Sequence, residues 1–122
     1  MTQTAQVAQT GFENYLQEIP VEIRRAIRAL GDDSRLLIVT ALMKRGELSF
    51  SQLLEGIGGN SSTLTHHLRV LIEACLIRNF YAKKQGVDEY SFYDISGFGA
   101  LFVKNLFHTL DVIPKAHSAT KP

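Results

Sequence analysis

Apolar residues recur at helical spacing over the first part of the chain. Between residues 12 and 30 they return every three or four positions, which predicts a helix that kinks or restarts at Pro20. Residues 34–44 are apolar nearly all round, so this segment should form the most buried helix. Asp32 stands at the N-cap position of that helix and Gly46 just after its last turn.

The next segment contains a short helix, a tight turn and a two-faced helix. Ser49 opens the short helix, and Gln52 stands at the capping-box offset from it. Gly58 and Gly59 predict the turn, after which Asn60 or Ser61 caps a helix that runs to about residue 74. One face of that helix is apolar and the opposite face carries hydroxyl, imidazole and guanidinium groups.

A β-hairpin and a last helix complete the predicted order. Residues 76–83 and 89–95 are rich in aromatic and β-branched side chains and flank a turn at 84–88. The last helix begins at Ser96 and Gly97 and ends at Pro114. The fold class is therefore mainly α with a small β-hairpin, in the order helix, helix, short helix, helix, hairpin, helix.

Length and composition indicate one ordinary globular domain. The chain has 122 residues, 45% of them hydrophobic and 20% charged. We expect a flexible arm at residues 1–10, the domain at 11–112 and a flexible tail at 113–122. With no apolar run long enough for a membrane helix, no signal-like N-terminus and a single cysteine, the sequence predicts a cytoplasmic protein without membrane contact.

The charge is unevenly distributed although the net charge is only +1. Between Arg24 and Lys84 ten basic residues outnumber five acidic ones, whereas the remaining segments carry three basic and seven acidic residues. A basic middle together with a helix-turn-helix and a hairpin favours a nucleic-acid surface. The residues expected to contact DNA are on the two-faced helix (Ser61, Ser62, Thr63, Thr65, His66 and Arg69) and at the hairpin tip (Lys83, Lys84 and Gln85).

Four stretches between residues 25 and 95 resemble one known family. Residues 30–36 (LGDDSRL), 46–53 (GELSFSQL), 62–71 (STLTHHLRVL) and 73–77 (EACLI) are similar to motifs of ArsR-type winged helix-turn-helix repressors. The resemblance implies that the two-faced helix is the recognition helix and the hairpin the wing. It also implies that the first and last helices form a homodimer.

The chain departs from the family's metal-sensing members. Residues 48–54 lack the cysteine pair of those members, and His108 with Asp111 supplies only half of the zinc pattern on the last helix. We therefore expect no metal and no other cofactor, with a sensing role for His108 and Asp111 left open. Cys75 stands where the family places a glycine in left-handed conformation, and a cysteine there should cost about 1 kcal/mol if that conformation is kept. The sequence leaves two interpretations of Cys75 open: a small buried side chain or a redox sensor.

The last helix is apolar over more than half of its circumference. Packing on its own domain would use one stripe, so the remainder predicts self-association. The expected interface residues are Phe98, Leu101, Phe102, Leu106, Phe107 and Leu110.

These observations favour a homodimeric, DNA-binding transcriptional regulator that inserts its recognition helix into the major groove. Its partner would be double-stranded DNA with a near-palindromic operator. The resemblance implies repression, although the residues themselves leave activation open. No nucleophile–base pair, carboxylate pair or phosphate loop is present, so the sequence does not predict an enzyme. The alternatives are a winged-helix module that binds protein and, from the aromatic residues of the hairpin, an RNA-binding sheet.

Overall fold

The computed structural model describes residues 11–86, 88 and 90–113. Its elements follow one another from the N-terminus as α2 (Glu13–Gln17), α3 (Val21–Ala29), α4 (Asp33–Arg45), β1 (Leu48–Ser49), α5 (Phe50–Ile57), α6 (Ser61–Glu73), β2 (Ile77–Tyr81), β3 (Ser91–Ile95), α7 (Gly97–His108) and the 3₁₀ helix η1 (Thr109–Val112). The expected arm at residues 1–10, and the expected tail except Ile113, lie outside the described residues.

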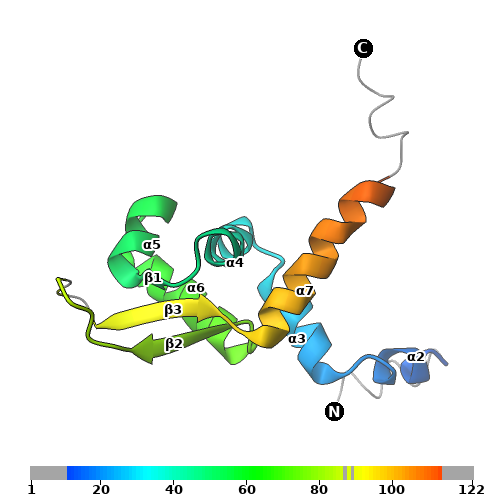
Figure 1. Cartoon of the computed structure of the whole chain (residues 1–122). Coiled ribbons are helices and arrows are strands. Elements are labelled where there is room, and N and C mark those ends of the chain that lie inside the picture. Colours follow the sequence, from blue (N-terminus) through cyan, green and yellow to red (C-terminus); the bar gives the residue numbers. More distant parts are fainter. Residues whose placement is uncertain (1–10, 87, 89, 114–122) are drawn as a thin grey trace.

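The first predicted helix is two helices that meet near Pro20. Pro20 is the N-cap of α3, with φ −56° and ψ 149°, so the helix restarts directly after it. Helix α3 buries Ala26 and Ala29, whereas α2 buries none of its residues. Figure 1 shows α2 extending away from the other helices.

Helix α4 lies at the centre of the core, as its sequence predicted. Its Ile38, Val39 and Leu42 are almost inaccessible to solvent, and the helix contacts α5, α6, α7 and β3. The side chain of Asp32 caps α4 by accepting from the backbone N–H of Arg35 at 3.2 Å. The other buried apolar residues of the core cluster are Ala26, Ala29, Leu30, Leu53, Leu64, Leu68, Leu71, Ala74, Leu76, Ile77 and Val103.

The sheet has three antiparallel strands in the order β1-β3-β2, one strand more than the expected hairpin. Strands β2 and β3 form the hairpin, with Phe80 opposite Phe92. The added strand β1 pairs Leu48 with Tyr93 and Ser49 with Phe92. Two residues show no alternation, so the sequence could not reveal β1, and Ser49 was expected only as a helix cap. That cap is also present, as a complete capping box with Gln52.

Helices α5 and α6, the turn between them and the hairpin form a winged helix-turn-helix. Gly58 and Gly59 both have positive φ, near 85° and 83°, which lets the chain reverse between the two helices. In Figure 1 the wing tip points away from the body at one end, while α7 projects from the other end. The predicted fold class is confirmed.

Candidate nucleic-acid interface

Helix α6 is anchored at its start by its own cap. The Asn60 side chain accepts from the backbone N–H of Thr63 at 2.9 Å, leaving the other N–H groups of the first turn available. On one side of the helix Leu64, Leu68 and Leu71 are buried in the core. The six predicted DNA-contact residues of α6 are all exposed: Ser61, Ser62, Thr63, Thr65, His66 and Arg69. The helix therefore presents a polar face that no other described element covers.

His67 follows His66 in the chain but is half-buried rather than exposed. Its Nδ1 lies 3.1 Å from Nη1 of Arg35 on α4. A guanidinium group only donates, so Nδ1 of His67 is the acceptor in this contact. Arg35 also donates from Nε to the backbone oxygen of Ala29 at 2.6 Å. The Arg35–His67 contact spans 32 residues, which is why local patterns could not predict it.

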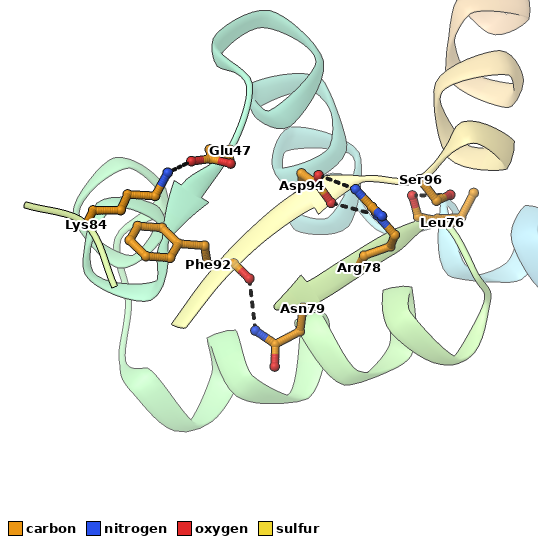
Figure 2. A network of polar contacts seen from close by, with 8 residues as sticks. All are labelled: Glu47, Leu76, Arg78, Asn79, Lys84, Phe92, Asp94 and Ser96. Atoms are coloured by element: carbon orange, nitrogen blue, oxygen red, sulfur yellow. Dashed lines mark hydrogen bonds and ion pairs between the residues drawn. The ribbon is translucent and has the colours of Figure 1, made fainter. Parts of the chain in front are cut away.

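At the wing tip the three predicted contact residues are in different environments. Lys83 and Gln85 are exposed, whereas Lys84 is half-buried. Lys84 forms an ion pair with Glu47, and its Nζ lies 4.9 Å from the ring centre of Phe92 (Figure 2). Lys84 is therefore already partnered in the absence of DNA. Local sequence patterns could not identify Glu47 as the partner of Lys84, because 37 residues separate the pair.

Side-chain contacts across the hairpin hold the wing in register. Arg78 donates two hydrogen bonds to Asp94, at 3.0 Å and 2.6 Å, and this contact raises the pKa of the guanidinium group above its usual value. On the other face Asn79 donates to the backbone oxygen of Phe92 at 2.9 Å (Figure 2). These contacts therefore connect β2 with β3 where Arg78 is paired with Asp94 and Asn79 with Tyr93.

The C-terminal end of α6 is a Schellman motif with a cysteine in the left-handed position. Cys75 has φ 63°, and its N–H donates to the oxygen of Ile72, while the N–H of Leu76 donates to that of Leu71. The left-handed conformation that the family's glycine adopts is thus kept with a cysteine in its place. The reading of Cys75 as a buried side chain is wrong, because the motif turns it outward and it is exposed.

The start of α7 is joined to this motif. Ser96 caps α7 by accepting from the N–H of Gly99 at 2.8 Å. The Ser96 hydroxyl donates toward the carbonyl oxygens of Cys75 and Leu76, which lie 2.7 Å and 3.0 Å from its Oγ. Hydrogen bonds of one side chain therefore connect the end of the candidate recognition helix with the start of the last helix (Figure 2).

The predicted interface residues of the last helix fall into two groups. Phe98 and Phe102 are half-buried and pack against the core cluster, with ring centres 5.7 Å apart. The other four and η1 remain solvent-exposed: Leu101 and Leu110 at 61%, Leu106 at 42% and Phe107 at 43%. Large apolar residues are also exposed at the N-terminal end of the described chain: Phe12, Tyr15, Ile19, Val21 and Ile27.

The sequence also predicted that the chain holds no metal ion and does not contact a membrane. Among the residues described, no three His, Cys, Asp or Glu side chains lie close enough together to hold a metal ion, and His108 and Asp111 are exposed. Across the same residues, every helix is too short or too polar to cross a membrane.

Comparison with known proteins finds chains that are similar to this one in sequence. Residues 32–79, which contain α4 to α6, match the family "bacterial regulatory protein, arsR family". A protein of Staphylococcus aureus, described as a cadmium resistance transcriptional regulatory protein CadC homolog, is 35% identical over 52 residues. The aligned segment covers 43% of this chain and 43% of that protein, so less than half of the relative's length is matched.

Solved structures share the fold at lower identity. A transcriptional regulator homologue from Pyrococcus horikoshii is 21% identical, with 84% of this chain and all of that chain covered and a TM-score of 0.63. A homodimeric winged helix-turn-helix DNA-binding domain from Mycobacterium bovis is 22% identical, with 74% and 78% covered and a TM-score of 0.57. The resemblance to ArsR-type winged helix-turn-helix regulators is confirmed.

Proposed function

We propose that this chain, whose residues 32–79 match the arsR family, is a DNA-binding transcriptional regulator that acts as a homodimer and represses by occupying its operator. The observation that carries the proposal is the uncovered polar face of α6, opposite the buried Leu64, Leu68 and Leu71. Helices of this kind enter the major groove of DNA. The S. aureus relative, named as a transcriptional regulatory protein, supports the same class of function.

The residues of α6 divide by reach. Ser61, Ser62 and Thr63 occupy the first turn, where short hydroxyls and free backbone N–H groups suit a phosphate. Thr65 and His66 lie one turn further along, and Arg69 one turn beyond them. Arg69 is exposed and can pair with both acceptors on the major-groove edge of guanine. We assign phosphate contacts to the first turn and base contacts to His66 and Arg69.

The wing would contact the sugar-phosphate backbone of the DNA beside this helix. Lys83 and Gln85 are exposed and can meet a phosphate directly. Lys84 reaches DNA only by exchanging Glu47 for a phosphate, so its net contribution is smaller than that of a free lysine.

The homodimer would use the exposed apolar side chains of α7 and of the N-terminal helices. Leu101, Leu106 and Phe107 are exposed on α7, and Leu110 is exposed on η1. Helix α7 projects from the rest of the molecule (Figure 1). In this proposal residues 11–112 act as one DNA-binding and dimerisation unit. A twofold dimer places two recognition helices in successive major grooves, so the operator would be a near-palindrome with half-sites about one helical turn apart.

The experiment that tests the proposal is a binding profile of Arg69→Ala. Operators selected with the wild-type protein are substituted one base pair at a time, and Arg45→Ala, an exposed arginine outside α6, serves as the control. We expect Arg69→Ala to lose about 1–3 kcal/mol of discrimination at one symmetric pair of positions and to keep it elsewhere. Equal weakening on all operators would make Arg69 a phosphate contact only. Failure of the wild type to bind any duplex at low salt would overturn the proposal in favour of a protein-binding module.

A further inference from the structure

A cleft of about 660 Å³ lies between α3 and α6 and is lined by three arginines. Its lining consists of Arg25, Arg28 and Ala29 from α3, Arg35 from α4, and Val70, Glu73 and Ala74 at the end of α6. The opposite flank of α6, with Leu68 and Ile72, faces Tyr93 of the sheet instead. The arginine cleft is therefore separate from the wing and borders the other side of the candidate recognition helix.

The positive charge of the cleft is only partly balanced. Arg25 and Arg28 are three residues apart on one face of α3, and Glu73 is the one carboxylate in the lining. Within residues 11–86, 88 and 90–113, the ion pairs are Arg78–Asp94 and Lys84–Glu47, so none of the three arginines is paired there. Three guanidinium groups on one cleft repel one another, and an anion would relieve that repulsion.

Arg35 is held in place before any ligand arrives. Its Nε donates to the oxygen of Ala29 and its Nη1 to Nδ1 of His67, so the direction of its guanidinium plane is set by two elements, α3 and α6. The cleft floor is formed by small side chains, Ala29 and Ala74, both almost fully buried. Space for a ligand thus lies next to a preoriented, half-buried arginine and two flexible, exposed ones.

We propose that this cleft binds a phosphate group. Guanidinium groups present forked pairs of N–H donors that match phosphate oxygens, and arginine is preferred over lysine where such pairing is needed. The phosphate can come from the DNA backbone or from a phosphorylated small molecule. The first source rests on the proposed function, because Glu73 belongs both to the cleft and to the polar face of α6, one turn beyond Arg69. The second source does not depend on DNA binding.

The test uses the full chain and the double variant Arg25→Gln with Arg28→Gln. Both side chains are exposed, so the fold should persist. The matched control is Lys44→Gln with Arg45→Gln, which removes two exposed charges from the last turn of α4, away from the cleft. Each protein is titrated with inorganic pyrophosphate by calorimetry. Each is also titrated with duplex DNA at several salt concentrations.

Each source has its own expected result. For a DNA phosphate, the Arg25/Arg28 variant should flatten the slope of log K against log salt by up to about two units relative to the control. For a small-molecule phosphate, the variant should bind pyrophosphate at least about tenfold more weakly than the control, with the same DNA slope. If the variant matches the control in both titrations, the phosphate site is refuted. If the wild type binds no DNA, the proposed function fails, and the pyrophosphate titration alone decides on the cleft.

Discussion

Gly99 is the position where a single methyl group should be most disruptive. A Cβ atom at Gly99 would lie 2.0 Å from the carbonyl oxygen of Leu76 and 2.9 Å from its carbonyl carbon. That oxygen cannot move freely, because it accepts from both the backbone N–H and the hydroxyl of Ser96, each at 3.0 Å. The close approach of α7 to the end of α6 therefore requires glycine at this position.

The loss of stability expected for Gly99→Ala can be worked out from the contacts that the added methyl group would disrupt. Moving the Leu76 oxygen aside would break two hydrogen bonds from Ser96, a loss of about 2 kcal/mol. Overpacking adds about 1–3 kcal/mol, and the better helix propensity of alanine returns about 1 kcal/mol. Gly99→Ala should therefore lower the free energy of unfolding by about 2–4 kcal/mol, and the melting temperature by roughly 8 °C or more.

Urea and thermal unfolding followed by circular dichroism measure this effect. Gly56→Ala in α5 is the matched control, since no atom lies within 4 Å of a Cβ added there. It should leave stability unchanged or raise it by up to about 1 kcal/mol. If Gly99→Ala unfolds at the wild-type midpoint or above it, the close contact between α7 and Leu76 does not exist as described.

Three further outcomes are expected. Replacing Glu47 with Gln frees Lys84 and should strengthen DNA binding and steepen its salt slope by up to about one unit; an unchanged slope would show that Lys84 does not reach DNA. The pKa of Asp32 lies below its usual 3.8, chiefly because its carboxylate accepts a backbone hydrogen bond, so its stabilisation holds above that pH and is lost as the pH falls below it. Asp32→Asn should abolish this acid-dependent loss in unfolding experiments between pH 2 and 5, and an unaltered profile would refute the assignment. Replacing Leu106 and Phe107 with Glu should give monomers in analytical sedimentation, and a persisting dimer would exclude this face.

Features encoded by neighbouring residues could be predicted from the sequence. Asp32, Ser49, Asn60 and Ser96 each cap the helix that follows, because a cap needs only a short polar side chain and a free N–H three residues later. The left-handed conformation of Cys75 was suggested only by the resemblance to a family that places glycine there, because cysteine itself does not favour positive φ. The polar face of α6 follows from helical periodicity alone.

Features that depend on distant residues could not be predicted in this way. Strand β1 exists because its two residues pair with β3, more than 40 positions later. The exposure of Cys75 depends on the turn that carries Leu76 into the core. The three arginines of the cleft come from α3 and α4, and the cleft that they line exists only because α3 packs against α6. In each case the determining contact is tertiary and leaves no periodic signal.

The same distinction governs the candidate DNA contacts themselves. Residue type and helical position predict that Arg69 and Lys84 can each reach a nucleic acid. Arg69 has no ion pair among the described residues, so its full charge is available to a base or a phosphate. Lys84 must first leave Glu47 and the ring of Phe92, so part of any new interaction only replaces an old one. Cations of equal charge therefore contribute unequally to binding, and the fold determines whether a cation must first leave a partner.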